Sequence, residues 1–140
     1  MISQTVEYAF RTIAYLSGKP DRWLSGEEIA EKTRVPHNYL LKILNQLRKS
    51  GLVESRKGWG GGFMLPSRKM RTPLFQVVDI LEGRKELGRC VFGFGKCDCR
   101  NPCPLHGHWE RINESYRAML RDTTFADLKG ADLGRMRSGK

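Results

Sequence analysis

Apolar side chains recur at helical spacing in five blocks of the chain, and glycine or proline residues separate most of these blocks. The pattern predicts a mainly α-helical protein with helices at residues 2–17, 25–33, 36–50, 74–81 and 104–122. Ser25 lies three residues before Glu28, which is the spacing of a capping box. Pro36 fits the first turn of the third helix. We therefore expect well-defined starts for the second and third helices.

The third predicted helix has two faces of opposite character. Its apolar stripe consists of Leu40, Ile43, Leu44 and Leu47. About 180° away on the helix lie Asn38, Lys42, Asn45 and Lys49. Two short helices joined by a tight turn, the second with a polar outer face, are typical of a helix-turn-helix.

A glycine-rich segment follows this helix, between two short strand-like runs at residues 52–55 and 63–65. Its sequence is Arg56-Lys57-Gly58-Trp59-Gly60-Gly61-Gly62. The glycines permit a tight hairpin tip with two cations at its start, so the pattern predicts the wing of a winged helix. A plain flexible loop is the main alternative. A phosphate-binding loop does not fit, because no helix and no Lys-Ser/Thr pair follow the glycines.

The C-terminal half combines a linking helix, a cysteine-rich loop and a long last helix. The segment from Cys90 to Cys103 shows no periodicity and is long for a loop in a compact domain, so we expect it to be functional. The apolar positions of the last helix step by four and three residues, like a heptad seam, at Leu105, Trp109, Ile112, Tyr116 and Met119. This seam favours packing against a partner helix over packing on its own domain.

We accordingly predict three regions. Residues 1–72 form the winged helix-turn-helix, and residues 73–103 form the linking helix and the cysteine loop. Residues 104–140 form a dimerisation helix and a C-terminal tail.

Length and composition narrow the class of protein. The 140 residues suit one compact domain, and 39% hydrophobic residues in periodic blocks do not fit a disordered chain. The longest uncharged stretch, Gly58 to Ser67, is short and glycine-rich, so we expect no membrane span. Glu7 and Arg11 interrupt the only candidate hydrophobic region of a secretory signal. These features favour a cytoplasmic protein, in which clustered cysteines indicate metal or redox chemistry rather than disulfides.

The charge is strongly basic and unevenly distributed. Lys and Arg number 25 against 15 Asp and Glu, which gives a formal net charge of +10. Between Arg48 and Arg71 the chain has seven basic residues and the single acid Glu54. Such a field favours a polyanionic partner, and in the cytoplasm that partner is usually nucleic acid.

Four cysteines gather in the predicted loop, at positions 90, 97, 99 and 103, and His106 follows three residues later. Soft thiolates select zinc, copper(I) or iron–sulfur clusters. If Pro104 begins the last helix, Cys103 is its N-cap and the helix dipole favours its thiolate. Zinc sites usually show paired cysteines with two to four residues between them, whereas the three gaps here hold six, one and three residues. The spacing favours a labile cluster, with a structural zinc site and unliganded thiols as alternatives.

Several motifs together give the chain a resemblance to a known family. It resembles the winged-helix regulators that include the iron–sulfur-cluster regulator IscR and the nitric-oxide sensor NsrR, the Rrf-type repressors. The motifs span nearly the whole chain: Glu7-Tyr8-Ala9, Tyr39-Leu40, Leu47-Arg48-Lys49-Ser50-Gly51-Leu52-Val53, Lys57-Gly58, Gly61-Gly62-Phe63, and Cys103-Pro104-Leu105-His106 leading to Trp109. The resemblance implies a homodimeric DNA-binding transcription factor and not an enzyme. Most members of this family are repressors. The resemblance further implies that an iron–sulfur cluster controls DNA affinity.

By the same resemblance, Cys90, Cys97 and Cys103 are expected to hold the cluster, and Cys99 is an additional thiol that could substitute for one of them. The fourth ligand is expected to be either His106 or Glu7, the latter from the first helix of the partner subunit. An ordinary exposed helix carboxylate is the alternative role for Glu7. We favour a [2Fe–2S] cluster over a [4Fe–4S] cluster.

A winged-helix dimer of this kind would bind double-stranded DNA with a palindromic operator. Its two recognition helices would enter successive major grooves about 34 Å apart. The expected DNA-contacting residues fall into three groups: Asn38, Tyr39 and Lys42 at base edges, with His37 and Gln46 nearby; Arg48, Lys49 and Arg56 at phosphates; and Lys57 in the narrow groove, with Gly58, Trp59 and Gly60 at the wing tip. Tyr39 fits a partly buried structural role equally well. The alternatives to a cluster-controlled regulator are a zinc-binding or metal-free winged-helix regulator and an iron–sulfur redox protein.

Overall fold

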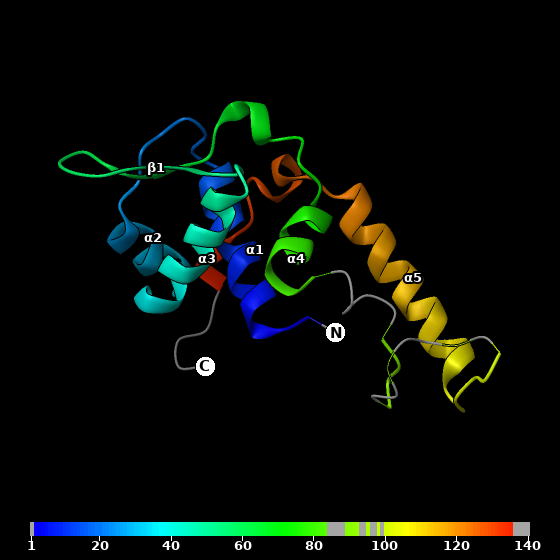
Figure 1. Cartoon of the computed structure of the whole chain (residues 1–140). Helices are drawn as coiled ribbons and strands as arrows, with labels where there is room; N and C mark the ends of the chain where they lie inside the picture. Colours follow the sequence, from blue (N-terminus) through cyan, green and yellow to red (C-terminus); the bar gives the residue numbers. More distant parts are fainter. Residues whose placement is uncertain (1, 84–88, 93–94, 96–97, 99, 136–140) are drawn as a thin grey trace.

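The computed structural model describes residues 2–83, 89–92, 95, 98 and 100–135 (Figure 1). In these ranges the chain forms five α-helices, one two-stranded antiparallel sheet and three short 3-10 helices. In chain order they are α1 (Gln4–Ser17), α2 (Gly26–Thr33), α3 (His37–Lys49), β1 (Glu54–Arg56), β2 (Gly62–Met64), η1 (Ser67–Lys69), α4 (Leu74–Glu82), α5 (His106–Asp122), η3 (Phe125–Leu128) and η4 (Leu133–Arg135). The mainly α-helical class with a small hairpin is confirmed.

Helix α1 is the element on which the others pack. It contacts α2, α3, α4 and η3. Its inward residues Val6, Ala9, Ile13 and Leu16 are completely buried. Burying one large aliphatic side chain contributes about 1.5–3 kcal/mol, so this face supplies much of the energy that holds the helices together. The helix starts at Ser3, whose hydroxyl accepts a hydrogen bond from the Val6 amide at 3.2 Å.

Helices α2 and α3 form the predicted helix-turn-helix. Arg34 ends α2 in the left-handed conformation, with φ +56°, and the next residue, Val35, is buried. Pro36 is the N-cap of α3 and has an extended ψ of 133°, so its predicted place inside the first turn is wrong by one position. Its carbonyl still accepts the first helical hydrogen bond, from the Leu40 amide at 2.8 Å, and the helix therefore begins directly after it.

The capping box predicted for α2 is formed in one half only. The Glu28 amide donates to the Ser25 hydroxyl at 3.1 Å, as expected. The Glu28 carboxylate instead accepts a 2.5 Å hydrogen bond from the hydroxyl of Tyr15 in α1. Burial, together with this bond to Glu28, raises the pKa of Tyr15 to about 12. A tertiary contact between α1 and α2 thus takes the place of the second local bond.

Helices α1 to α4 and η3 pack into one body, which we call the head. The hairpin of β1 and β2 projects from it (Figure 1). Its strands pair Glu54 with Met64 and Arg56 with Gly62, and thus lie close to the predicted runs. Leu24 attaches the hairpin to the head by exchanging backbone hydrogen bonds of 2.8 and 2.9 Å with Phe63. A Cβ atom on Gly62 would lie 2.1 Å from the Leu24 carbonyl oxygen, so this approach requires glycine.

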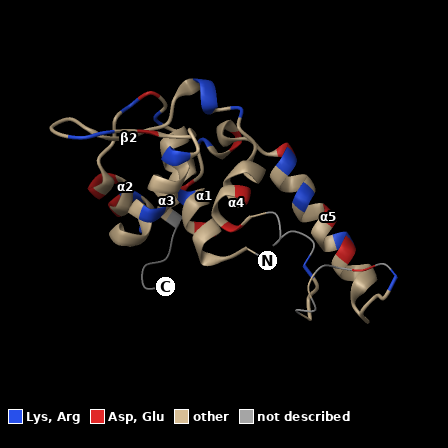
Figure 2. Ribbon diagram, in the orientation of Figure 1, with Lys and Arg blue, Asp and Glu red and all other residues tan. Residues whose placement is uncertain are grey.

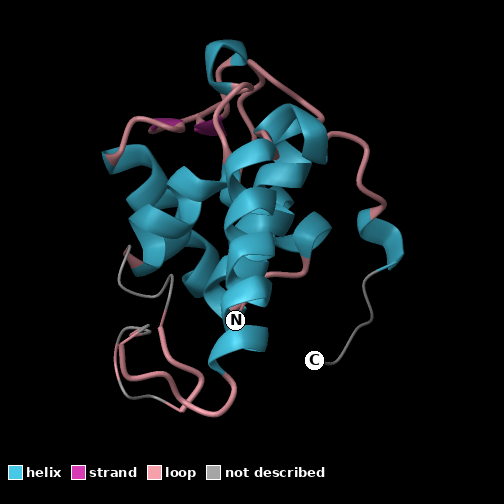
Figure 3. Ribbon diagram, turned by 90° about the vertical axis from the view of Figure 1, so that its right-hand side faces the viewer, coloured by secondary structure: helices cyan, strands magenta, loops and turns pink. Residues whose placement is uncertain are grey.

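Helix α4 begins after its N-cap Pro73 and buries Leu74, Val77 and Val78, as the pattern predicts. Helix α5 packs on α4 and then extends away from the head, with its N-terminal end farthest out (Figures 1 and 3). The loop that leads into α5 lies at the end of that helix opposite the strands (Figure 3). None of the helices in the described residues is long and apolar enough to cross a bilayer.

The start predicted for the last helix is corrected by two residues. Helix α5 begins at His106, and its N-cap is Leu105 rather than Cys103. The His106 amide donates to the Cys103 carbonyl at 3.0 Å, which closes a separate turn before the helix. The expected stabilisation of a Cys103 thiolate by an N-cap position is therefore not supported.

The seam predicted along α5 divides into two stripes. Tyr116 is buried on the head, beside Asn113 and Leu120 on the same helix. The large apolar residues at heptad spacing, Leu105, Ile112 and Met119, are instead 44%, 48% and 41% exposed. The expectation that Tyr116 faces a partner helix is wrong for this packing. At 3.6 residues per turn, Tyr116 points about 40° away from Ile112 and about 60° away from Met119, so the two sets of seam positions can face different neighbours.

Candidate functional site

The outward face of α3 is polar and fully accessible. Of the predicted contact residues on this helix, six are exposed: His37, Asn38, Lys42, Gln46, Arg48 and Lys49. The opposite face is closed by Leu40, Ile43, Leu44 and Leu47, none more than 1% exposed. The two-faced character of the helix is confirmed, because burial of the leucine stripe on α1 and α4 determines which side chains meet solvent.

Tyr39 occupies a different position from its neighbours on α3. It is half-buried, and its hydroxyl hydrogen-bonds with that of Thr5 in α1 at 2.5 Å. Its ring meets the ring of Tyr8 edge-on, with centroids 5.2 Å apart. These contacts hold the N-terminal part of α3 against α1, which is the structural role considered for this residue. A direct base contact by Tyr39 stays a prediction.

A shallow depression connects the C-terminal end of α3 with the base of the wing. Arg48 and Gly51 line one side, and Glu54 and Ser55 of β1 line the other. Figure 2 shows basic residues on the wing, on α3 and at η1, whereas α5 has both signs of charge along its length. Exposed basic side chains therefore lie both on α3 and on the wing, at either side of this depression.

The stem of the wing is held by Arg56. Its guanidinium lies over the indole of Trp23, 4.4 Å from the ring centroid, and donates to the Gly60 carbonyl at 2.8 Å. The sequence predicts a phosphate contact for Arg56 and gives no local signal for its partner Trp23, which lies in a loop more than thirty residues earlier. Lys57, the other predicted cation of the wing, is exposed.

The predicted metal ligands are placed only in part. Cys90 is buried, and its amide donates to the Gly95 carbonyl at 2.6 Å; Cys103 is half-buried. Cys97 and Cys99 lie outside the described residues. Among the residues that are described, no three His, Cys, Asp or Glu side chains converge on a common point.

The two candidates for a fourth ligand lie on different helices. His106 is the first residue of α5, and its Nε2 lies 4.0 Å from Glu110 Oε2. Glu7 is exposed on α1, where its carboxylate forms a 2.8 Å ion pair with Arg11. Its environment is that of the ordinary helix carboxylate considered as its alternative role.

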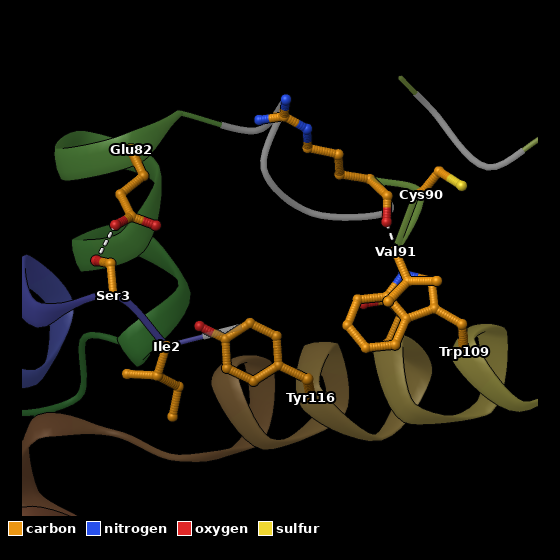
Figure 4. A pocket seen from close by; sticks show the side chains of 9 residues that line it. Ile2, Ser3, Glu82, Cys90, Val91, Trp109 and Tyr116 are labelled. Carbon is orange, nitrogen blue, oxygen red and sulfur yellow. Dashed lines mark hydrogen bonds between the residues drawn. The ribbon is translucent and has the colours of Figure 1, made fainter. Parts of the chain in front are cut away.

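A cavity of about 620 Å³ separates the cysteine segment from the head (Figure 4). Tyr116 and Trp109 project toward it from α5, and Cys90 lines its outer end (Figure 4). The Trp109 indole donates to the Arg89 carbonyl at 2.6 Å, which ties the cysteine segment to α5. On the inner side the Ser3 hydroxyl donates to the Glu82 carboxylate (Figure 4).

These contacts place the cavity between the cysteine segment and the packed helices. Ser3 belongs to the start of α1 and Glu82 to the end of α4, so the cavity borders two of the helices that contact α3. Burial, and then the nearby charge of Glu82, raises the pKa of Tyr116 above its ordinary value. The sequence contained no local signal for this junction.

The architecture is that of a winged helix-turn-helix protein of the DNA-binding regulator class. The sequence profile of the Rrf2 family, described as "Iron-dependent Transcriptional regulator", matches residues 2–131. The chain belongs to this family, which confirms the resemblance seen in the sequence motifs.

Individual relatives agree with this assignment. The chain is 33% identical over 114 residues to the HTH-type transcriptional repressor NsrR of Streptomyces coelicolor, covering 81% of this chain and 76% of that one. It is 30% identical to the HTH-type transcriptional regulator NsrR of Shouchella clausii, covering 91% and 87%. Among solved structures, CymR, the global cysteine regulator of B. subtilis, superposes with a TM-score of 0.77 at 24% identity, covering 94% and 98%. The relatives are regulators, as expected, and not enzymes.

The contact between Tyr39 and Thr5 generates a test of how Tyr39 acts. We expect Tyr39→Phe and Thr5→Val each to lower the free energy of unfolding by about 0.5–1.5 kcal/mol, because each removes the same hydrogen bond. Urea denaturation of both variants and of the double variant measures this coupling. If Tyr39 acts through α1, Thr5→Val weakens DNA binding as much as Tyr39→Phe does. A loss of affinity in Tyr39→Phe alone would contradict the structural role and indicate a direct contact.

Proposed function

We propose that this protein is a homodimeric DNA-binding transcriptional repressor whose operator affinity is controlled by an iron–sulfur cluster. The observation that supports DNA binding most directly is the set of exposed basic side chains on the outer face of α3 and on the wing. On α3 the exposed side chains include amide and ammonium groups, and the major groove of DNA is wide enough to admit a helix. On the wing the exposed cations lie on a narrow hairpin.

Within this proposal the exposed side chains have distinct roles. Asn38 suits bidentate hydrogen bonding to adenine, and Lys42 suits the acceptor edge of guanine. His37 and Gln46 flank them on the same helix. Arg48 and Lys49, at the end of the helix, neutralise phosphates and add affinity with little sequence preference.

The wing contributes through Lys57, because Arg56 is engaged with Trp23 and Gly60. Arg56 then acts as the residue that positions the wing, and its partial exposure still lets it add positive charge at the groove. Lys57 reaches the narrow minor groove, where the negative potential is strongest.

A salt titration distinguishes the proposed roles of Asn38 and Lys57. Using a palindromic operator selected from random-sequence DNA, we expect Asn38→Ala to weaken specific binding by about 1–3 kcal/mol and to leave binding to unrelated DNA unchanged. We expect Lys57→Ala to weaken both and to reduce the salt slope by about one. Fluorescence anisotropy measures both effects. Lys129→Ala, which removes an exposed lysine outside α3 and the wing, is the control. Unchanged binding in both test variants would overturn the assigned surface.

A second copy of this chain is the proposed occupant of the exposed stripe on α5. Leu105, Ile112 and Met119 repeat at seven-residue intervals and leave large apolar side chains in solvent. That repeat is the spacing of a helix–helix seam. Because α5 leaves the head at one end, pairing along this stripe would keep both recognition helices free for DNA.

This pairing predicts that Ile112→Glu converts the protein to a monomer, since it places charge in the middle of the stripe. Sedimentation equilibrium measures the mass, and circular dichroism checks that the helices persist. Arg111→Glu inserts the same charge at an exposed neighbour outside the stripe and should leave the dimer intact. A dimeric Ile112→Glu protein would contradict the proposed seam.

The cluster proposal rests on the chemistry of the donors and on the family's iron dependence. Cys90, Cys97 and Cys103 would hold the group, with Cys99 as a further thiol, and thiolate sulfur is the usual ligand of iron–sulfur clusters. When bound, such a cluster supplies a centre that responds to redox change and to nitric oxide. The buried, backbone-anchored position of Cys90 suits a ligand that must be held in place.

The local geometry favours His106 over Glu7 as the fourth ligand. The His106 amide is hydrogen-bonded to the Cys103 carbonyl, so the histidine lies in the turn that follows a proposed cysteine ligand. Glu7 forms an ion pair with Arg11 of its own chain, whereas as a ligand it would act from the partner subunit.

We expect anaerobically purified protein to contain iron and acid-labile sulfide, with about two of each per chain for a [2Fe–2S] cluster. We expect His106→Ala to change its visible absorption spectrum, whereas Glu7→Ala leaves it unchanged. His108→Ala, at an exposed histidine paired with Arg111, is the matched control. A changed spectrum in Glu7→Ala alone would assign the role to Glu7. A colourless protein that holds zinc would exclude cluster control and leave the DNA-binding surface intact.

The contacts around the cavity beside Cys90 suggest how a change at the cluster would alter DNA affinity. The cysteine segment is tied to α5 by the bond from Trp109 to Arg89, and α5 packs on α4. The bond from Ser3 to Glu82 then joins α4 to α1, which supports α3. A coupling of about 1–3 kcal/mol through these packed elements would change DNA affinity 5–150-fold.

A further inference from the structure

We infer that Trp59, at the tip of the wing, is an apolar wedge that inserts between two base pairs in the minor groove of the operator. This inference rests on the proposed DNA-binding function and deepens it. It adds a specificity determinant that would select a deformable base step beside the site contacted by α3.

The exposure of Trp59 is unlike that of any other large apolar residue in the described part of the chain. Its side chain is fully exposed, whereas none of the others exceeds 50%. An indole has a large apolar surface and usually finds cover in a folded protein. Complete exposure on a projecting hairpin therefore indicates a side chain that is covered only when a partner is bound (Figure 1).

The tip that presents this indole is built from glycines. Gly58 and Gly60 have φ values of +91° and +72°, which glycine adopts without strain. The Gly61 amide donates to the Gly58 carbonyl at 3.1 Å, and a Cβ atom on Gly61 would lie 2.1 Å from the Arg56 carbonyl oxygen. The turn is therefore closed by its own backbone.

This construction makes the tip narrow. Residues 58, 60, 61 and 62 are all glycine, so the indole of Trp59 is the only side chain between Lys57 and Phe63. The minor groove of B-DNA is about 6 Å wide, and a hairpin tip with a single side chain suits such a groove. Arg56 braces the stem against Trp23 and Gly60, which reduces the backbone freedom that the hairpin would lose on binding.

The charges around the tip favour DNA over an apolar protein surface as the partner. Lys57 is exposed directly beside Trp59, and the only acid of the hairpin, Glu54, lies at its base within 3.7 Å of Arg68. In nucleic-acid-binding proteins, aromatic rings stack on bases while neighbouring cations contact the phosphates. Trp59 and Lys57 offer this combination. The depression lined by Arg48 and Ser55 continues this surface to α3, so one duplex can contact both.

A wedge of this kind reads DNA through its deformability. Apolar side chains inserted from the minor groove partly unstack a base step and kink the duplex. Pyrimidine–purine steps such as TA and CA/TG unstack most easily. We therefore expect a preference for such a step at the position of the wing, although no side chain there forms a hydrogen bond that identifies a base.

The test uses the full-length protein and the selected palindromic duplex, with one 2-aminopurine moved through the positions that flank each half-site. We expect wild-type protein to raise the 2-aminopurine fluorescence at one step, because unstacking relieves its quenching, and Trp59→Ala to abolish that rise. We expect Trp59→Ala to weaken binding about 5- to 150-fold, the effect of losing one base–aromatic stack. Its thermal unfolding should match that of wild type, since the side chain has no cover to lose.

Combining a change of the base step with Trp59→Ala tests whether Trp59 acts at that step. Replacing the responsive step by AA should weaken binding of wild-type protein and have no effect on Trp59→Ala. Lys57→Ala is the matched control, because it should lose affinity and still raise the fluorescence. Equal affinities of wild type and Trp59→Ala would overturn the wedge, as would a loss of affinity without any Trp59-dependent fluorescence rise. If selection from random-sequence DNA yields no duplex that wild-type protein binds, the proposed function is overturned instead.

Discussion

Burial of the apolar face of α1 is the interaction on which the rest of the structure depends. Val6, Ala9 and Ile13 are inaccessible to solvent because α2, α3, α4 and η3 cover them. The rotation of α3 about its axis follows from this packing, since its leucine stripe must turn toward α1 and α4. The polar face of α3 is therefore presented outward as a consequence of core formation, and its chemistry is available to a partner without any further rearrangement.

The wing is attached to the same core by backbone pairing with the segment before α2. Leu24 and Phe63 exchange two hydrogen bonds, and Gly62 allows the approach. Arg56 then braces the projecting part against Trp23. A hairpin of three-residue strands has little stability alone, so these attachments explain why it keeps a fixed orientation relative to α3.

Helix α5 serves two surfaces at once. One side, with Tyr116 and Leu120, is buried on the head, and the other leaves Ile112 in solvent. Its N-terminal end is joined to the cysteine segment through Trp109. Helix α5 thus joins the cysteine segment to the packed helices, and its exposed side is the surface that the proposed second subunit would cover.

The sequence by itself determined the elements whose signals are local. Helical periodicity identified the two faces of α3, the glycines of the wing identified a hairpin, and the motif around Cys103 indicated the family. Contacts between distant residues were decided only by the tertiary structure: Tyr39 with Thr5, Arg56 with Trp23, and Tyr116 against the head rather than a partner. The physical reason is that periodicity shows which side of a helix is apolar, whereas its neighbours are chosen by how all the helices share one core.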